Sequence, residues 1–262
     1  MRILGIFIFL ILFTFSVANE DFNTHVVDKP LFDYFENNEP HMKRTLHLEC
    51  TSWKFAVEAN NLRPWKIIPQ ECADYVRKYI TGGAYNMEID RVSREAGAFA
   101  LSMKLGEDGK DVWIFDVDET LLSNVPYYSQ HGYGSEVSNS VEFDKWVEKG
   151  VARAIVSSLK LYQDVKSLGF KVFLLTERSE RHRIVTVENL MNAGFQYWDK
   201  LILRGSEDHG KSATIYKSEK RNEMVQEGLR IAGNSGDQWS DLLGSSASIR
   251  YFKLPNLMYY IP

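Results

Sequence analysis

The sequence predicts an α/β fold with a parallel sheet at its centre and helices on both faces. From residue 111 onward, short apolar segments alternate with helical patterns, which is typical of βαβ units. The first such segment, residues 112–115, is rich in bulky side chains and ends in two carboxylates, Asp116 and Asp118. Polar loops also follow two later strands, and the carboxyl ends of parallel strands are where ligands bind in such sheets.

The first eighteen residues have the order of a secretory signal peptide. Arg2 is followed by an apolar run over residues 3–15 and then by the small residues of a cleavage site at 16–18. We expect residues 1–18 to be removed, with a signal anchor as the alternative. No later apolar stretch is long enough to span a membrane. The expected mature protein is therefore soluble, without a membrane contact, and extracellular (cell wall or apoplast) or vacuolar.

The next residues are expected to form an arm and then helices. Residues 19–45 are polar, contain Pro30 and Pro40, and lack a clear period, so we predict an extended N-terminal arm. Helical patterns over 51–63 and 69–105 predict an N-terminal helical part. The main domain is expected to span 46–262, with this helical part at 46–108.

Each remaining element follows from local pattern in turn. A small cap-like insertion is expected after the first strand, because residues 124–150 cluster aromatic and polar side chains without a strand pattern. The other expected elements are a helix at 151–168, a strand at 171–176, a helix at 180–193, a strand at 200–204, a helix at 217–227, a strand at 230–232 and a last strand at 249–254.

Two cysteines, Cys50 and Cys72, are present. An even pair behind an export signal predicts one disulfide, and two free buried thiols are the alternative. The chain has a net charge of −4 and 25% charged residues, without a basic stripe. This composition gives no support for nucleic-acid binding.

The candidate functional residues all lie at predicted strand ends. Successive strand side chains point to opposite faces, so Asp116 and Asp118 share a side. They are a candidate nucleophile and general acid/base, although an acidic turn is the simpler interpretation. Thr176 ends another apolar strand, and Asp237 and Asp241 lie in a glycine-rich segment after a third.

Charge repulsion decides how these carboxylates can coexist. Two like charges about 4 Å apart repel by roughly 4 kcal/mol at an effective dielectric of 20. A hard divalent cation and a lysine would compensate, and Mg²⁺ accepts carboxylates, water and phosphate oxygens. The residues therefore predict a magnesium site.

The motifs together resemble a known family. Residues 116–120 read Asp-Val-Asp-Glu-Thr, which is similar to the first motif of the haloacid dehalogenase-like (HAD-like) superfamily. Residues 115–124, 174–178, 216–221 and 233–244, with 52–62 ahead of them, resemble the plant acid phosphatase and vegetative storage protein family, a class B-like branch of that superfamily. This resemblance implies a HAD-like Rossmannoid sheet and a secreted acid phosphatase acting on small phosphate monoesters.

The resemblance also implies roles. Asp116 would be the nucleophile that forms an aspartyl-phosphate, and Asp118 the general acid and base. Thr176 would orient the phosphoryl group. Separately from the resemblance, the basic cluster of Arg178, Arg181, His182 and Arg183 suggests that Arg178 steers the substrate, although such clusters are usually solvated helix starts. A lysine would neutralise charge, with Lys217 preferred over Lys211 and Lys220. The implied magnesium ligands are Asp116, Asp118 through its carbonyl, Asp237 and Asp241.

Two other functions remain open. Residues 205–212 fit the P-loop pattern of nucleotide-binding proteins, yet Glu207 and Asp208 would repel a polyphosphate. A non-catalytic storage protein on the same fold is the second alternative, and an active enzyme is also compatible with storage. Some members of the storage branch lack the nucleophile, whereas this chain keeps Asp116. The sequence leaves the choice between monomer and homodimer open.

Overall fold

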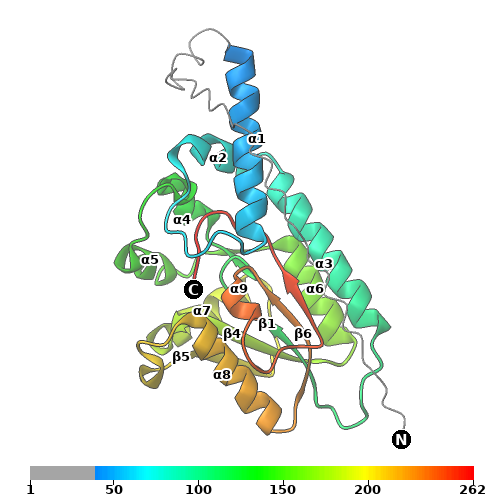
Figure 1. Ribbon diagram of the computed structural model, residues 1–262. Coiled ribbons are helices and arrows are strands. Elements are labelled where there is room, and N and C mark those ends of the chain that lie inside the picture. Colours follow the sequence, from blue (N-terminus) through cyan, green and yellow to red (C-terminus); the bar gives the residue numbers. More distant parts are fainter. Residues whose placement is uncertain (1–38) are drawn as a thin grey trace, which may run out of the picture. The chain divides into compact units, whose positions relative to one another are not determined.

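Strand β1 (Asp111–Phe115) lies in the middle of a five-stranded parallel sheet with the order β5-β4-β1-β6-β7 (Figure 1). The structure is a computed structural model, and it describes residues 39–262. The other strands of this sheet are β4 (Lys171–Ser179), β5 (Lys200–Arg204), β6 (Arg230–Gly236) and β7 (Arg250–Lys253). The predicted α/β fold with a parallel sheet is confirmed.

Helices surround this sheet, and a separate pair of short strands flanks the insertion. The helices are α1 (Glu39–Glu58), α2 (Ala73–Thr81), α3 (Ala84–Ser102), α4 (Val125–Gln130), α5 (Ser140–Val147), α6 (Val156–Ser167), α7 (Arg183–Asn192), α8 (Ala213–Gln226) and α9 (Trp239–Leu242). Strands β2 (Leu122–Ser123) and β3 (Arg153–Ala154) form a separate antiparallel pair. The region predicted as an insertion, 124–150, contains α4 and α5 and lies between these two strands.

Helices cover both faces of the sheet because β1 is apolar on both sides. Trp113 and Phe115 point into a core formed with α3, α6 and α7. Val112 and Ile114 point the other way, into a core formed with α8. All four side chains are buried, and each contributes roughly 1.5–3 kcal/mol by leaving water. Figure 1 shows α3 and α6 side by side on their face.

The strand order places a binding edge at the carboxyl end of β1. The chain runs from β1 to β4 and β5 on one side of the sheet, then returns to β6 and β7 on the other side. The order of the strands therefore reverses at β1. In open α/β sheets, ligands bind outside the carboxyl ends of the strands at such a reversal. The loops after β1, β4 and β6 meet there.

A second core joins the N-terminal helices, the insertion and the end of the chain. Val76 and Ile89 come from α2 and α3, Tyr127 and Tyr128 from α4, and Leu257 from the segment after β7. All five side chains are buried. The insertion is therefore held by the N-terminal helices and the C-terminal segment.

The predicted extended arm over 19–45 is wrong at its end, because α1 begins at Glu39. Pro40 lies in the first turn of α1, where a missing N–H costs little because this group has no intrahelical acceptor. Helix α1 also ends at Glu58 rather than at 63. The rest of the arm and the signal peptide, 1–18, lie outside the described residues. Among residues 39–262, no helix is both long and apolar enough to cross a membrane.

Of the boundaries that differ from the prediction, two have a reason in packing and pairing. The segment from Gly233 to Gly236, expected as a loop, belongs to β6. A Cβ on Gly233 would lie 2.5 Å from the Trp113 ring, and one on Gly236 would lie 2.4 Å from Asp241 Oδ2. Glycine is needed at both positions because other groups approach the strand closely. Helix α6 begins at Val156 rather than 151, because residues 153 and 154 pair with β2.

The predicted disulfide joins Cys50 of α1 to Cys72, with the Cα atoms 5.4 Å apart. The bond closes a sequence separation of 22 residues. Replacing both cysteines with serine is expected to lower the free energy of unfolding by about 3 kcal/mol in the chain-entropy description. Urea unfolding of the two proteins measures this difference. Two thiols that alkylate in the unreduced native protein would contradict the bond.

Candidate active site

The loop after β1 brings two aspartates to one side. Val117 is fully buried in the core beneath the sheet end, and its carbonyl accepts hydrogen bonds from the Leu121 and Leu122 amides at 2.9 and 2.8 Å. The loop is thereby folded back on Val117. Asp116 and Asp118, on either side of it, both line a common cavity. The alternation expected from the sequence is confirmed.

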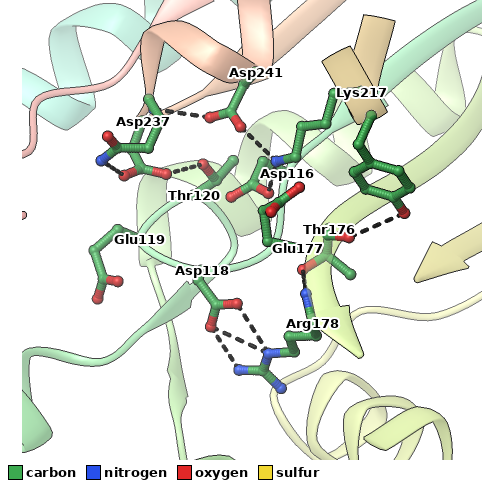
Figure 2. Close-up of polar contacts among 12 residues, drawn as sticks. Asp116, Asp118, Glu119, Thr120, Thr176, Glu177, Arg178, Lys217, Asp237 and Asp241 are labelled. Carbon is green, nitrogen blue, oxygen red and sulfur yellow. Dashed lines mark hydrogen bonds and ion pairs between the residues drawn. The ribbon is translucent and has the colours of Figure 1, made fainter. Parts of the chain in front are cut away.

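Lys217 joins Asp116 to the loop after β6. Its Nζ donates to Asp116 Oδ1 at 2.5 Å and also contacts Asp241 Oδ1, and all three side chains are buried (Figure 2). Burial acts to lower the pKa of Lys217, but the charges of Asp116 and Asp241 raise it, so it remains protonated.

The rival lysines lie elsewhere. Lys211 contacts Asp208 and Glu219, and Lys220 contacts Glu223. Of the three lysines considered from the sequence, the structure therefore places Lys217 beside Asp116.

Asp116, Asp237 and Asp241 form a buried acidic cluster. One carboxylate oxygen from each lies within 4.8 Å of the others. Each pair of full charges at that separation repels by roughly 3–4 kcal/mol at an effective dielectric of 20. Burial raises the pKa of Asp116, and the charges of Asp241 and Asp237 add to this effect while Lys217 opposes it. Three convergent oxygen ligands that one lysine only partly neutralises fit a divalent metal ion.

Donors hold Asp237 in a fixed orientation. The Gln238 and Asn256 side-chain amides each donate to Oδ2 at 2.7 Å, and the Thr120 hydroxyl donates to Oδ1 at 3.3 Å. Burial, followed by the charge of Asp241, nevertheless raises the pKa of Asp237 to about 6. Such orienting contacts are typical of carboxylates that bind a metal.

Asp118 is held apart from this cluster, on the side of β4. Arg178 Nη2 donates to Asp118 Oδ1 at 2.7 Å and Arg178 Nε to Oδ2 at 3.0 Å (Figure 2). Burial acts to raise the pKa of Asp118, but Arg178 and the Asn124 amide lower it below its usual value. Its carboxylate is therefore not a member of the acidic cluster, and a contribution to a metal site would come from its backbone carbonyl.

The two remaining predicted residues, Thr176 and Arg178, lie two positions apart on β4. Thr176 is fully buried and accepts a hydrogen bond from the Arg178 amide at 3.1 Å. It does not line the cavity, whereas Glu177 and Arg178 do. Arg178 also donates to Thr186 Oγ1 at 3.3 Å, so its guanidinium is fixed on two sides. The structure brings both residues to the edge where Asp116 and Asp118 lie.

A cavity of about 540 Å³ opens over these residues. Its size suits a small organic molecule. The insertion contributes one wall through Phe143, Asp144 and Val147 of α5, and the C-terminal segment contributes Tyr259 and Tyr260. The described residues that bear acidic or basic groups in its lining are Lys66, Asp116, Asp118, Asp144, Glu177, Arg178, Arg181, His182, His209, Lys217, Asp237 and Asp241.

Several polar residues of the site were missed from the sequence. Glu119 has a φ of 54°, an uncommon conformation for a side chain other than glycine. Its carboxylate accepts hydrogen bonds from the Tyr259 hydroxyl at 2.8 Å and from the Asn124 amide N–H at 2.5 Å. Burial and the charges of Asp237 and Asp118 raise the pKa of Glu119 to about 8. The only feature of the sequence that could have pointed to Glu119 as a site residue is its position inside the first motif.

The predicted P-loop alternative does not fit the geometry. The buried Asp208 carboxylate accepts hydrogen bonds from the Gly205 amide at 3.2 Å and from Lys211 Nζ at 2.8 Å. The amide and the lysine that would hold a phosphate are thus directed at an aspartate within the same loop. The nearby negative charge would also repel a nucleotide.

Comparisons with known proteins show the family of this chain. A family model described as HAD superfamily, subfamily IIIB (acid phosphatase) matches residues 37–262. Acid phosphatase 1 of Solanum lycopersicum is 67% identical over 98% of this chain and 99% of its own length. Vegetative storage protein 2 of Arabidopsis thaliana is 38% identical over 82% of this chain and 82% of its own length.

A solved structure supports the fold. The class C acid phosphatase from Bacillus anthracis superposes with a TM-score of 0.58, over 71% of this chain and 83% of that chain, at 22% identity. At this identity the likeness supports the fold alone. The family match over all of the described residues and the identity to the tomato enzyme show that this chain belongs to the acid phosphatases of HAD superfamily subfamily IIIB.

Proposed function

We propose that this chain hydrolyses small phosphate monoesters through an aspartyl-phosphate on Asp116, with Mg²⁺ as cofactor. The observation that carries the proposal is the pairing of buried Asp116 with Lys217 beside two further aspartates, at the floor of a cavity that Asp118 also lines. Hydrolysis of p-nitrophenyl phosphate by the purified chain tests it. An inactive, correctly folded protein would favour a storage role instead.

In the first step, an oxygen of the Asp116 carboxylate attacks phosphorus. The bond from phosphorus to the ester oxygen breaks, and the protonated Asp118 carboxyl gives its proton to the departing alcohol. Lys217 and Arg178, which line the cavity, bind and orient the phosphoryl group in this proposal, and buried Thr176 supports Arg178 by accepting a hydrogen bond from its backbone amide. The fixed positive charge of Lys217 stabilises the charge that develops on the phosphoryl oxygens.

In the second step, water attacks the phosphorus of the aspartyl-phosphate. The Asp118 carboxylate takes a proton from this water, the bond to the Asp116 oxygen breaks, and inorganic phosphate leaves. Asp118 thereby regains the proton that it gave to the alcohol, and Asp116 regains its carboxylate. Arg178 lowers the pKa of Asp118, which keeps the carboxylate ionised for this step and makes the protonated form used in the first step a stronger acid.

The Asp116 and Asp237 carboxylates, with the Asp118 carbonyl, would hold the Mg²⁺, and Asp241 would bind directly or through water. This set consists of oxygen ligands, which suits a hard cation. The bound ion would neutralise charge on the phosphoryl group and on the cluster itself. The close approach of three carboxylates supports the assignment.

Replacing Asp118 with asparagine is expected to trap the intermediate. Nitrophenolate leaves without help from an acid, so Asp116 still becomes phosphorylated by p-nitrophenyl phosphate. Hydrolysis of the aspartyl-phosphate then lacks its base and slows by roughly 10²–10⁴-fold. Acid quenching after mixing with labelled substrate, followed by peptide mapping, measures label at Asp116. The same experiment on the Asp116→Asn variant should give no label, and label on another residue would contradict the mechanism.

We also propose that residues 1–18 direct the chain into the secretory pathway, towards the cell wall or the vacuole. The Cys50–Cys72 disulfide supports this location, because such bonds persist in oxidising compartments. The exported protein should begin at Asn19, which N-terminal sequencing tests. Similarity to vegetative storage proteins supports a storage role as a second function of an active enzyme.

A further inference from the structure

The side chain of Asn124 connects Asp118 to the insertion. Its Nδ2 donates to Asp118 Oδ1 at 2.8 Å and to Glu119 Oε2 at 3.1 Å. Its Oδ1 accepts a hydrogen bond from Trp146 Nε1, on α5, at 2.8 Å. Asn124 is fully buried, whereas Asp118 and Trp146 are partly exposed, so water is kept from the Asn124 side of these contacts.

Trp146 determines which way the Asn124 amide faces. An indole N–H can only donate, so the atom that faces it must be the carbonyl oxygen of the amide. The opposite orientation would place Asn124 Nδ2 against the indole N–H and its oxygen against two carboxylates. That arrangement loses three hydrogen bonds and adds repulsion. The indole therefore holds Nδ2 towards Asp118.

The contacts of Asp118 distinguish its two oxygens. Oδ1 accepts from Asn124 Nδ2 and from both Nε and Nη2 of Arg178, at 2.8, 3.2 and 2.7 Å. Oδ2 accepts from Arg178 Nε alone among the described residues, at 3.0 Å. Oδ1 has three donors for two lone pairs, whereas Oδ2 retains capacity. Oδ2 is therefore the oxygen suited to carry a proton towards the cavity.

We propose that Asn124 and Trp146 are positioning residues that hold Asp118 with Oδ2 directed at the leaving group of the substrate. The proposal rests on the acid role of Asp118 in the proposed function. It makes α5 part of the catalytic apparatus. The same helix lines the cavity through Phe143 and Val147, so the wall that contacts the leaving group also orients the acid.

This proposal has a kinetic signature. The value of kcat/KM reports formation of the aspartyl-phosphate. This step depends more strongly on the proton of Asp118 when the leaving oxygen is more basic. An alkyl phosphate releases a strongly basic alkoxide unless it is protonated. Nitrophenolate is a stable anion. A misplaced Asp118 should therefore slow an alkyl phosphate far more than p-nitrophenyl phosphate.

The test is Trp146→Phe, which keeps an aromatic ring but removes the indole N–H. We expect kcat/KM to fall about tenfold for glycerol phosphate and less than twofold for p-nitrophenyl phosphate. The tenfold fall corresponds to the loss of one hydrogen bond. Trp198→Phe is the matched control, because Trp198 packs against the main core and is not a contact of Asn124. The control should leave unchanged the ratio of kcat/KM for glycerol phosphate to kcat/KM for p-nitrophenyl phosphate, which we call the substrate ratio.

A double-mutant cycle tests whether Trp146 acts through Asn124. Asn124→Ala should lower the substrate ratio, and adding Trp146→Phe to Asn124→Ala should lower the substrate ratio no further. Equal losses on both substrates, or additive effects of the two changes, would overturn the proposal. If the proposed function itself is wrong, the result is different. The Asp116→Asn variant would then stay active, whatever substrate ratio the Trp146 and Asn124 variants show.

Discussion

Replacing Asp116 with asparagine is expected to lower phosphatase turnover by roughly 10⁴-fold or more, with the fold retained. The amide keeps the shape of the side chain but removes the attacking carboxylate, and losses of this size are typical when a nucleophile is removed. It also removes the negative charge that pairs with Lys217 at 2.5 Å. Steady-state hydrolysis of p-nitrophenyl phosphate measures the effect, and circular dichroism measures the fold.

A matched control lies at the other end of β1. Asp111 is buried, and its carboxylate pairs with Arg230 Nε at 2.9 Å, away from the cavity. Asp111→Asn should lower stability but leave turnover close to that of the unmodified protein. Near-normal turnover of Asp116→Asn would show that another group attacks phosphorus. His182 and His209, which line the same cavity, would then be the first to replace.

Removal of divalent metal is expected to abolish activity, and added Mg²⁺ should restore it. Without the ion, three carboxylate oxygens within 4.8 Å repel one another and the incoming phosphate, and Lys217 alone compensates only in part. Treatment with EDTA, confirmed by atomic absorption spectroscopy, followed by titration with Mg²⁺ measures this dependence. Full activity after exhaustive removal of metal would refute the assignment of Asp237 as a ligand.

Metal binding should also depend on pH. The pKa of Asp237 is raised to about 6 by burial and by the charge of Asp241, so below that pH the carboxyl is protonated. The metal must then displace a proton, and its dissociation constant should rise up to about tenfold for each pH unit below 6. Calorimetric titrations on either side of pH 6 measure this change.

Asp237→Asn removes one titrating group from the cluster, while Asp116, whose pKa is also raised, remains. The variant should bind the metal much more weakly, and its dissociation constant should rise less steeply below pH 6. Asp208→Asn is the control, because Asp208 is equally buried but pairs with Lys211 outside the cluster. An unchanged affinity in Asp237→Asn would place the metal elsewhere.

Much of the site was predictable because its residues follow strands. Asp116 directly follows an apolar segment, Thr176 ends one, and Asp237 follows strand β6 through a glycine-rich segment, and the carboxyl ends of parallel strands meet at one edge. The local sequence pattern is therefore enough to predict that these three residues lie close together. The same rule placed Asp241 near them, one helical turn further along the chain.

The choice of lysine could not be made in this way. The sequence suggested that the helix starts near residue 217, but the Ser212 hydroxyl accepts a hydrogen bond from the Ile215 amide and the helix begins at Ala213. Packing of Tyr216 and Met224 against the sheet then sets the rotation of α8. That rotation directs Lys217 at Asp116, and it follows from side-chain volume across the sheet rather than from local pattern.

By itself, the sequence determined the parallel sheet, the order of its main elements and the aspartates at its binding edge, because these depend on periodicity and on where apolar runs end. Only the tertiary structure decided which polar groups hold those aspartates. Asn256 reaches Asp237 across 19 residues, Arg178 reaches Asp118 across 60, and Tyr259 reaches Glu119 across 140. Such partners are brought together by packing of the core, and no local pattern encodes a contact between segments so far apart in the chain.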